Sequence, residues 1–207
     1  MRTKWTIDKR KYLDKSEVKK LLKTSNMEMK RGFKKKNYSV ARNWFTVILG
    51  LYSGLRVSEM ADLKNSDFLI YSSCAFIFVR KGKGNKKRMV RIGNELVKTF
   101  IDFTRFKEKI NISVADEMAV ICKNNATAYT TRSLQLAFKK CARKAGLEPH
   151  YSIHSLRHTY AVHLYKASNY NLRFVQEQLG HSSIRVTEVY ANVILDDAEK
   201  ALRRLYR

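Results

Sequence analysis

Apolar residues recur every three or four positions along several stretches of this chain, the spacing that places side chains on one face of an α-helix. The first stretch follows Asp14, and Glu17 three residues later completes a capping-box pattern, which predicts a helix that ends near residue 24. Residues 29–37 are rich in Lys and Arg and are expected to form a basic loop. A second, mostly buried helix is predicted over residues 38–52, where the apolar residues keep the helical spacing.

The middle of the chain has the pattern of short strands. Gly54 is expected to end the buried helix, and a short helix over residues 56–63 follows it. Three β-rich runs come next: residues 68–71, 75–79 and 88–92. Because turns separate them, these runs predict a small antiparallel sheet. Residues 81–87 contain two glycines and four lysines, and they are predicted to form the tip of its last hairpin.

The rest of the chain is predicted to be helical. The expected segments are residues 95–109, 131–145, 154–167, 172–179, 184–190 and 196–205. The fold class is therefore mainly α with one small three-stranded antiparallel sheet. We expect a basic lead-in over residues 1–11 and one compact domain over residues 12–207, because a chain of 207 residues that is 44% apolar can bury a single core.

The charge of the chain points to its partner. Lys and Arg number 42 against 18 Asp and Glu, which gives a formal net charge of +24 at pH 7. Such an excess favours a polyanion, and nucleic acid is the obvious candidate. The alternatives are a solubilising surface or a lipid-binding patch. A lipid-binding protein would be expected to combine its charge with an amphipathic anchor helix, and the sequence offers no such helix.

The cysteines and the apolar runs suggest where the protein resides. Cys74, Cys122 and Cys141 are far apart and lack the spacing of a zinc site, so we expect reduced, mostly buried thiols. No window approaches the run of about 18 apolar residues that a membrane helix needs. The protein is therefore expected to be soluble, unexported and cytoplasmic.

The first two patterns with possible chemistry lie near the predicted sheet. Arg56 begins a short helix and Glu59 follows at i+3, so the two side chains share one face. Taken alone, this pair is also consistent with an ordinary surface ion pair. Lys83 lies between two glycines at the hairpin tip, from which it can reach into a groove beside the sheet. The alternative is a general phosphate clamp that it shares with Lys81, Lys86 and Lys87.

The third pattern pairs His154 with Arg157 at i and i+3 on a predicted helix. Leu156, Tyr160 and Leu164 should form the buried stripe of that helix, and the polar pair should project together from the edge of the stripe. A lone histidine is more often a satisfied structural residue. A histidine and an arginine that point the same way, however, suit an oxyanion.

The fourth pattern leads from Gly180 and His181 to Tyr190, nine residues beyond the histidine. Gly180 should end one helix, and the two serines after His181 offer a cap for the next. This turn could bring the tyrosine back toward the histidine. Taken alone, Tyr190 could equally be one of eleven tyrosines packed against a core.

Together these residues suit attack on a phosphodiester without a metal ion. Guanidinium groups can bind the non-bridging oxygens as negative charge grows on them, and a phenol can serve as the nucleophile. A lysine on a hairpin tip can protonate the departing 5′ oxygen. A two-metal nuclease would need clustered Asp and Glu ligands, which the sequence does not present. We therefore expect neither a metal nor another cofactor.

At this point the sequence resembles the tyrosine recombinase, or phage integrase, family over about residues 12–206. Residues 52–59 are similar to its first arginine box, residues 81–86 to its lysine hairpin, and residues 154–159 with 179–190 to its second box. The resemblance implies the catalytic-domain fold of that family and the following roles. Arg56 and Arg157 bind the scissile phosphate, Lys83 is the general acid, His154 and His181 assist proton transfer and stabilise the transition state, Tyr190 becomes joined to the 3′ phosphate, and Glu59 supports the site.

The resemblance also implies a function. It suggests a site-specific DNA recombinase of a mobile element or a related system, active in integration, excision, inversion or resolution. A type IB-like topoisomerase and a noncatalytic DNA-binding protein are the alternatives, although the presence of all six residues argues against the second. Longer members of the family have a core-binding domain before the catalytic one. Here about eleven residues precede the pattern, so either the member is naturally short or that domain belongs to a removed or separate segment.

The family resemblance further implies assembly on DNA, with four protomers. We also expect the protein to be associated with the nucleoid. A helix over residues 195–206 follows Tyr190, and its apolar positions keep helical spacing: Leu195, Ala198, Leu202 and Leu205. This stripe is expected either to dock on a neighbouring protomer or to pack on its own domain.

Overall fold

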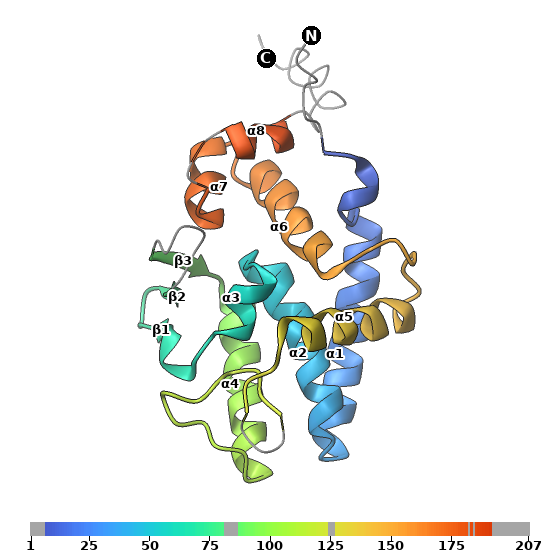
Figure 1. Cartoon of the computed structure of the whole chain (residues 1–207), viewed down its shortest axis with the longest axis vertical. Helices are drawn as coiled ribbons and strands as arrows, with labels where there is room; N and C mark the ends of the chain where they lie inside the picture. The colour runs from blue at the N-terminus through green and yellow to red at the C-terminus, as the bar shows by residue number, and fades with distance from the viewer. Residues whose placement is uncertain (1–6, 81–86, 124–126, 182, 184, 192–207) are drawn as a thin grey trace.

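A computed structural model of the chain describes residues 7–80, 87–123, 127–181, 183 and 185–191. The α-helices are α1 (Lys15–Lys34), α2 (Tyr38–Ser53), α3 (Val57–Ala61), α4 (Asn94–Lys109), α5 (Thr131–Lys144), α6 (Ile153–Ala167), α7 (Leu172–Leu179) and α8 (Arg185–Ala191). The 3-10 helices are η1 (Lys9–Lys11) and η2 (Asn65–Asp67), and the strands are β1 (Phe68–Ile70), β2 (Ala75–Val79) and β3 (Arg88–Ile92). The prediction of a mainly α fold with one small sheet is confirmed (Figure 1).

The sheet is antiparallel, with the order β1-β2-β3. Ala75, Ile77 and Val79 alternate along β2 as buried residues, which is the period-two pattern of a strand with one covered face. Val79 at the end of β2 pairs with Arg88 at the start of β3. In the sequence, Lys83 lies between these two paired residues.

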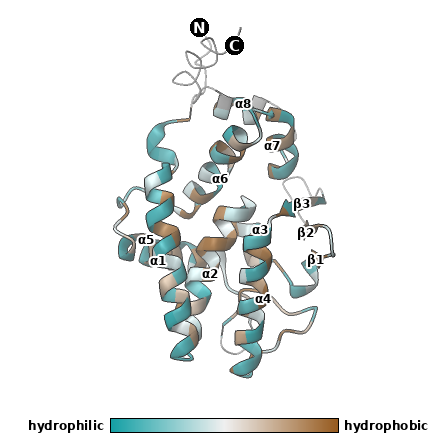
Figure 2. Cartoon of the chain, turned by 180° about the vertical axis from the view of Figure 1, so that it is seen from behind, coloured by the Kyte–Doolittle hydropathy of each residue, from teal (hydrophilic) through white to brown (hydrophobic). Residues whose placement is uncertain are grey.

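Helix α2 is the centre of the fold. It contacts α1, α4, α5 and α6, and Figure 2 shows apolar residues concentrated on it in the middle of the molecule. Phe45 of α2 stacks on Phe103 of α4 at 4.3 Å between ring centroids. Gly54 follows α2 in the left-handed conformation and ends it, as the sequence predicts.

Helix α1 corrects one prediction. Residues 29–34 continue the helix to Lys34 and do not form a basic loop. Met29 and Gly32 are buried, and a Cβ on Gly32 would lie 2.9 Å from the backbone nitrogen of Ala41 in α2. The close approach of α2 therefore stabilises a segment whose lysines and arginines, judged by composition alone, suggest a loop.

Helices α6, α7 and α8 gather at one end of the molecule, and the sheet lies at its side (Figure 1). Ala161, Val162, Tyr165, Val175, Leu179 and Tyr190 form a second, smaller core cluster there. The expected stripe on α6 is only partly correct, because Leu156 is buried while Tyr160 and Leu164 are half-buried. Residues 195–206, the predicted C-terminal helix, lie outside the described residues.

Two further expectations concern the cysteines and membranes. Cys122 and Cys141 are buried and Cys74 is half-buried, and all three are free thiols, as the sequence predicts. None of the helices in the described part of the chain is long and apolar enough to cross a membrane.

Candidate active site

The site begins at the turn between α2 and α3. Arg56 is the N-cap residue of α3, and its backbone N–H donates to Glu59 Oε2 at 2.8 Å. The Arg56 guanidinium also contacts Glu59 Oε1 at 2.9 Å. The Glu59 side chain is only 1% exposed, whereas that of Arg56 is 24% exposed. The predicted pair is therefore not an ordinary surface ion pair, because a buried carboxylate holds a partly open arginine.

Arg88, at the start of β3, is a second partner of Glu59 that the sequence reasoning missed. Its two terminal nitrogens contact the two Glu59 oxygens at 2.7 Å and 2.9 Å. Burial alone would raise the pKa of Glu59, but the hydrogen bonds and charges of Arg88 and then Arg56 lower it to about 2. Glu59 is therefore a permanent anion at neutral pH. The position of Arg88 beside the lysine hairpin was the available signal.

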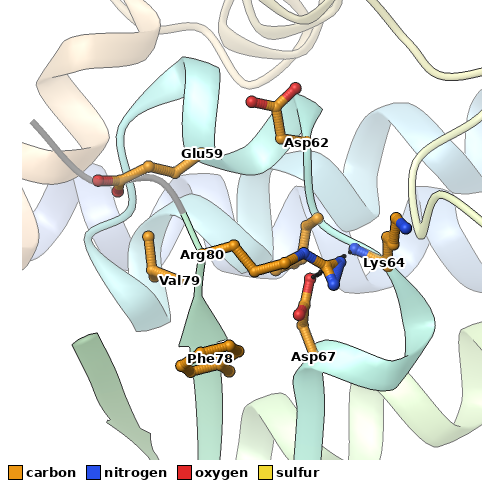
Figure 3. A pocket seen from close by; sticks show the side chains of 8 residues that line it. Glu59, Asp62, Lys64, Asp67, Phe78, Val79 and Arg80 are labelled. Atoms are coloured by element: carbon orange, nitrogen blue, oxygen red, sulfur yellow. Dashed lines mark hydrogen bonds and ion pairs between the residues drawn. The ribbon is translucent and has the colours of Figure 1, made fainter. Parts of the chain in front are cut away.

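On the other stem of the hairpin, Arg80 is also paired with a buried carboxylate. Arg80, directly after β2, contacts Asp67 Oδ2 at 2.6 Å, and the two side chains point toward one another beside a hollow of about 370 Å³ (Figure 3). The hairpin base is thus fixed on one side by Asp67 and on the other by Glu59. Lys83, with Lys81 and Lys86, lies outside the described residues, and Lys87 is exposed at the start of the second stem.

Arg157 links three parts of the site. Its Nη1 donates to the Gly54 carbonyl at 2.6 Å, and its Nη2 donates to the Leu179 carbonyl at 2.8 Å. The same Nη2 lies 3.1 Å from His181 Nε2. Burial, and then the charge of Arg56, lower the pKa of Arg157 to about 10. The guanidinium therefore stays charged at neutral pH while it holds α6 against the ends of α2 and α7.

His154 differs from its predicted partner. It is exposed in the first turn of α6, whereas Arg157 one turn later is buried. The expectation that the two project together from the edge of an apolar stripe is therefore wrong for Arg157, because the backbone carbonyls of two neighbouring helix ends draw its side chain inward.

His181 follows Gly180, which ends α7 with a φ of +64°. A Cβ on Gly180 would lie 2.5 Å from Arg88 Cδ, so glycine is needed there for both its conformation and its size. His181 Nδ1 lies 2.9 Å from the hydroxyl of Thr187 in α8. Burial, and then the charge of Arg157, lower the pKa of His181 to about 3. Because Arg157 can only donate, Nε2 accepts its hydrogen bond and the Nδ1–H donates to Thr187.

Tyr190 lies one turn beyond Thr187 on α8 and is 3% exposed. Its hydroxyl contacts His158 Nδ1 at 3.0 Å. The tyrosine therefore turns toward His158 and not toward His181, whose partner on α8 is Thr187. The sequence reasoning missed both His158 and Thr187. The available signals were that His158 directly follows Arg157 and that Thr187 lies three residues before Tyr190.

The electrostatics of this end of the molecule suit an anion. Arg56, Arg88 and Arg157 come from three separate parts of the fold. Glu59 forms ion pairs with two of them, Arg56 and Arg88. Burial raises the pKa of Tyr190, while the charges of Arg157 and Arg56 act in the opposite direction. The site can thus bind an oxyanion through guanidinium N–H groups, within electrostatic range of a buried phenol.

The fold and the site define a class of helical protein with an arginine-rich anion site beside a buried tyrosine. The chain belongs to the phage integrase family, whose sequence model matches residues 11–195. It is 31% identical over 189 residues to the tyrosine recombinase XerC of Caldanaerobacter subterraneus subsp. tengcongensis, a match that covers 91% of this chain and 48% of that protein. It is 35% identical over 157 residues to XerD of Rickettsia bellii, over 72% of this chain and 51% of that protein. The chain thus spans about half the length of these relatives.

Solved structures agree with the family. The XerH site-specific recombinase, in a post-cleavage complex with a palindromic difH substrate, has a TM-score of 0.74 and 26% identity and matches 92% of this chain and 52% of its own. The XerA recombinase has a TM-score of 0.73 and 25% identity, over 95% of this chain and 65% of its own. The predicted catalytic-domain fold of a tyrosine recombinase is therefore confirmed.

Proposed function

We propose that this chain is the catalytic domain of a site-specific recombinase that cleaves and rejoins DNA through a 3′-phosphotyrosine at Tyr190. One observation supports the proposal above all. Arginines from the N-cap of α3, from β3 and from α6 gather around Glu59 and the end of α7, and the charges of Arg157 and Arg56 act on the buried tyrosine of α8. Phosphate binding explains why three guanidinium groups lie together although only two of them, Arg56 and Arg88, have Glu59 as a buried counter-ion.

The proposed roles of the site residues are as follows. Arg56 and Arg157 bind the non-bridging oxygens of the scissile phosphate and stabilise the charge that develops on them. The phenolic oxygen of Tyr190 attacks phosphorus, and the bond from phosphorus to the 5′ oxygen breaks. The phosphotyrosine ester preserves the bond energy for rejoining, in which a 5′ hydroxyl displaces the tyrosine. Glu59 supports the site by orienting Arg56 through the contacts described above.

Three proton-transfer roles come from the family resemblance. Lys83 gives a proton to the departing 5′ oxygen. His181 stabilises the transition state, and its contact with Arg157 is consistent with that role. His154 assists proton transfer from the first turn of α6. The reaction needs no metal ion, and cleavage should therefore persist in excess EDTA.

Duplex DNA is the proposed partner. The XerH recombinase was solved with its palindromic difH substrate. The net charge of +24 favours binding of this chain to a polyanion such as DNA. On paired sites the active form is proposed to be a tetramer, in the cytoplasm and associated with the nucleoid. The segment of residues 195–206 is proposed to dock on a neighbouring protomer. Integration, excision, inversion and resolution all use this chemistry.

The test is covalent trapping on nicked duplexes. In a suicide substrate, a nick near the cleavage position releases a short fragment after attack, so the enzyme stays joined to the DNA. A library of nicked duplexes with randomised sequence is incubated with the protein, and adducts that resist SDS are recovered and sequenced. Wild type should form adducts, whereas Tyr190→Phe should bind DNA with nearly unchanged affinity and form none.

The alternatives give different results in this assay. A noncatalytic DNA-binding protein would give no adduct with wild type. A topoisomerase would give an adduct but no junction when a second cleaved duplex is supplied, whereas a recombinase would form the junction. An adduct that persists with Tyr190→Phe would show that Tyr190 is not the nucleophile.

A further inference from the structure

His158 is a half-buried, neutral base in contact with the proposed nucleophile. Its Nδ1 lies 3.0 Å from the hydroxyl oxygen of Tyr190. Among the described residues, His158 is the hydrogen-bond partner of that hydroxyl. Neither the motif resemblance nor the comparisons assign a role to this histidine.

The direction of the hydrogen bond follows from burial. The Tyr190 side chain lies inside the small core cluster at 3% exposure, and burial raises its pKa, so the phenol keeps its proton at neutral pH. A phenolic proton directed away from His158 would lack an acceptor among the described residues, which is costly for a buried hydroxyl. The Tyr190 O–H therefore donates, and His158 Nδ1 accepts with its proton on Nε2.

The other histidine near α8 is not available for this role. His181 Nε2 is engaged with Arg157, and His181 Nδ1 is engaged with Thr187. Thr187 and Tyr190 lie one turn apart on the same face of α8. Thr187 contacts His181, and Tyr190 contacts His158. This arrangement separates the histidine beside the phosphate-binding arginine from the histidine beside the phenol.

We propose that His158 is a catalytic residue of the recombination reaction and accepts the phenolic proton of Tyr190 as the tyrosine attacks phosphorus. In this step the bond from the tyrosine oxygen to phosphorus forms, the bond from phosphorus to the 5′ oxygen breaks, and the phenolic proton moves to His158 Nδ1. The 5′ oxygen takes its own proton from the general acid. In rejoining, the tyrosine leaves and recovers the proton from His158. The inference rests on the proposed function.

The charges around His158 favour this step once DNA is bound. Burial, and then the charge of Arg157, lower the pKa of His158 to about 4, and His154 on α6 and Lys11 on η1 act in the same direction. The imidazole is therefore unprotonated at neutral pH, but it is a weak base while the site is empty, because imidazolium is disfavoured there. A phosphate bound at Arg157 brings negative charge close to His158 and stabilises imidazolium. Substrate binding is thereby expected to make His158 a stronger base toward Tyr190.

Two substitutions separate proton transfer from simple positioning. His158→Asn retains a hydrogen-bond acceptor near the position of Nδ1 but has no basic nitrogen, whereas His158→Ala lacks both. His150→Asn is the matched control, because His150 is exposed before α6 and its recorded ring contact is a tilted one with Tyr151, not with a residue of the site. Single-turnover cleavage is measured on a suicide duplex recovered with wild type, together with DNA affinity and the thermal unfolding midpoint.

General-base catalysis contributes about 10² to 10⁴-fold, so both His158 variants should cleave more slowly by that factor, with DNA affinity unchanged. The same substrate with sulfur at the bridging 5′ position needs no acid. His158→Asn should stay slow on it, because the phenol still needs a base. His150→Asn should behave as wild type on both substrates.

Several outcomes would overturn the proposal. Cleavage by His158→Asn within about threefold of wild type would reduce His158 to a residue that only holds the phenol. Recovery of this variant on the sulfur substrate would place His158 on the leaving group. If His158→Ala fails to fold, His158→Asn decides the question. Absence of any adduct with wild type would refute the proposed function and this inference together, whereas a wild-type adduct with a fast His158→Asn would refute the inference alone.

Discussion

Glu59→Gln removes a buried negative charge that two arginines share. The substitution keeps the size of the side chain and one acceptor oxygen, but Arg56 and Arg88 lose their ionic partner. Both guanidinium groups then lie close to the charge of Arg157 without compensation. We expect the folded state to lose stability and the site to lose its geometry, because an unpaired charge in a partly buried position is costly.

The size of the effect follows from the carboxylate. The pKa of Glu59 is about 2 in the folded protein, against an ordinary value of 4.5. This difference corresponds to about 3 kcal/mol of folding free energy at neutral pH. Since the folded-state pKa is the lower one, the contribution is complete above the unfolded value of 4.5 and is lost as pH falls from there toward 2. Less than half of it should remain at about pH 3.

Urea unfolding of wild type and Glu59→Gln, measured at several pH values from neutral to acidic, tests this expectation. The difference between the two proteins isolates Glu59 from the other carboxylates. Glu177→Gln is the control, since Glu177 is 60% exposed in its pair with Arg173 and should contribute little. Equal costs for the two substitutions, or a cost of Glu59→Gln that does not shrink in acid, would refute the reasoning.

Three further predictions concern DNA. The logarithm of the binding constant should fall with the logarithm of the salt concentration, with a slope of roughly −0.9 for each phosphate contacted, and a flat response would argue against a DNA partner. Lys83→Ala should cleave normal DNA slowly but recover largely on DNA with sulfur at the bridging 5′ position; equal slowness on both would exclude the lysine as the acid. Deletion of residues 196–207 should preserve binding to a single site but abolish cooperative assembly on paired sites and lower cleavage. Unchanged assembly in gel shift or light scattering would rule out docking, and loss of folding would favour packing of this segment on its own domain.

Local patterns in the sequence determined most of the elements. The strands β2 and β3 and the helix α7 have the predicted bounds, and Asp14 with Glu17 forms the predicted capping box. Gly54 and Gly180 end their helices as expected. These features depend on hydrogen bonds and side-chain periods within a few residues, which a sequence displays directly.

The motifs also identified most of the site, since the charges of Arg56 and Arg157 act on both His181 and Tyr190. Their pairing, however, could not be read from spacing. Residues 181 and 190 suggested contact between His181 and Tyr190, yet the tyrosine lies against His158.

Only the tertiary structure decided these contacts and the length of α1. Arg88 reaches Glu59 from 29 positions away, and Tyr190 reaches His158 from 32. Such partners belong to elements whose relative placement is set by core packing, above all by α2 between α1 and α6. The same packing extends α1 to Lys34, because Gly32 allows a close approach that outweighs a loop-like composition. Periodicity specifies which face of an element is buried, but the residues that meet across two faces are chosen when those faces pack.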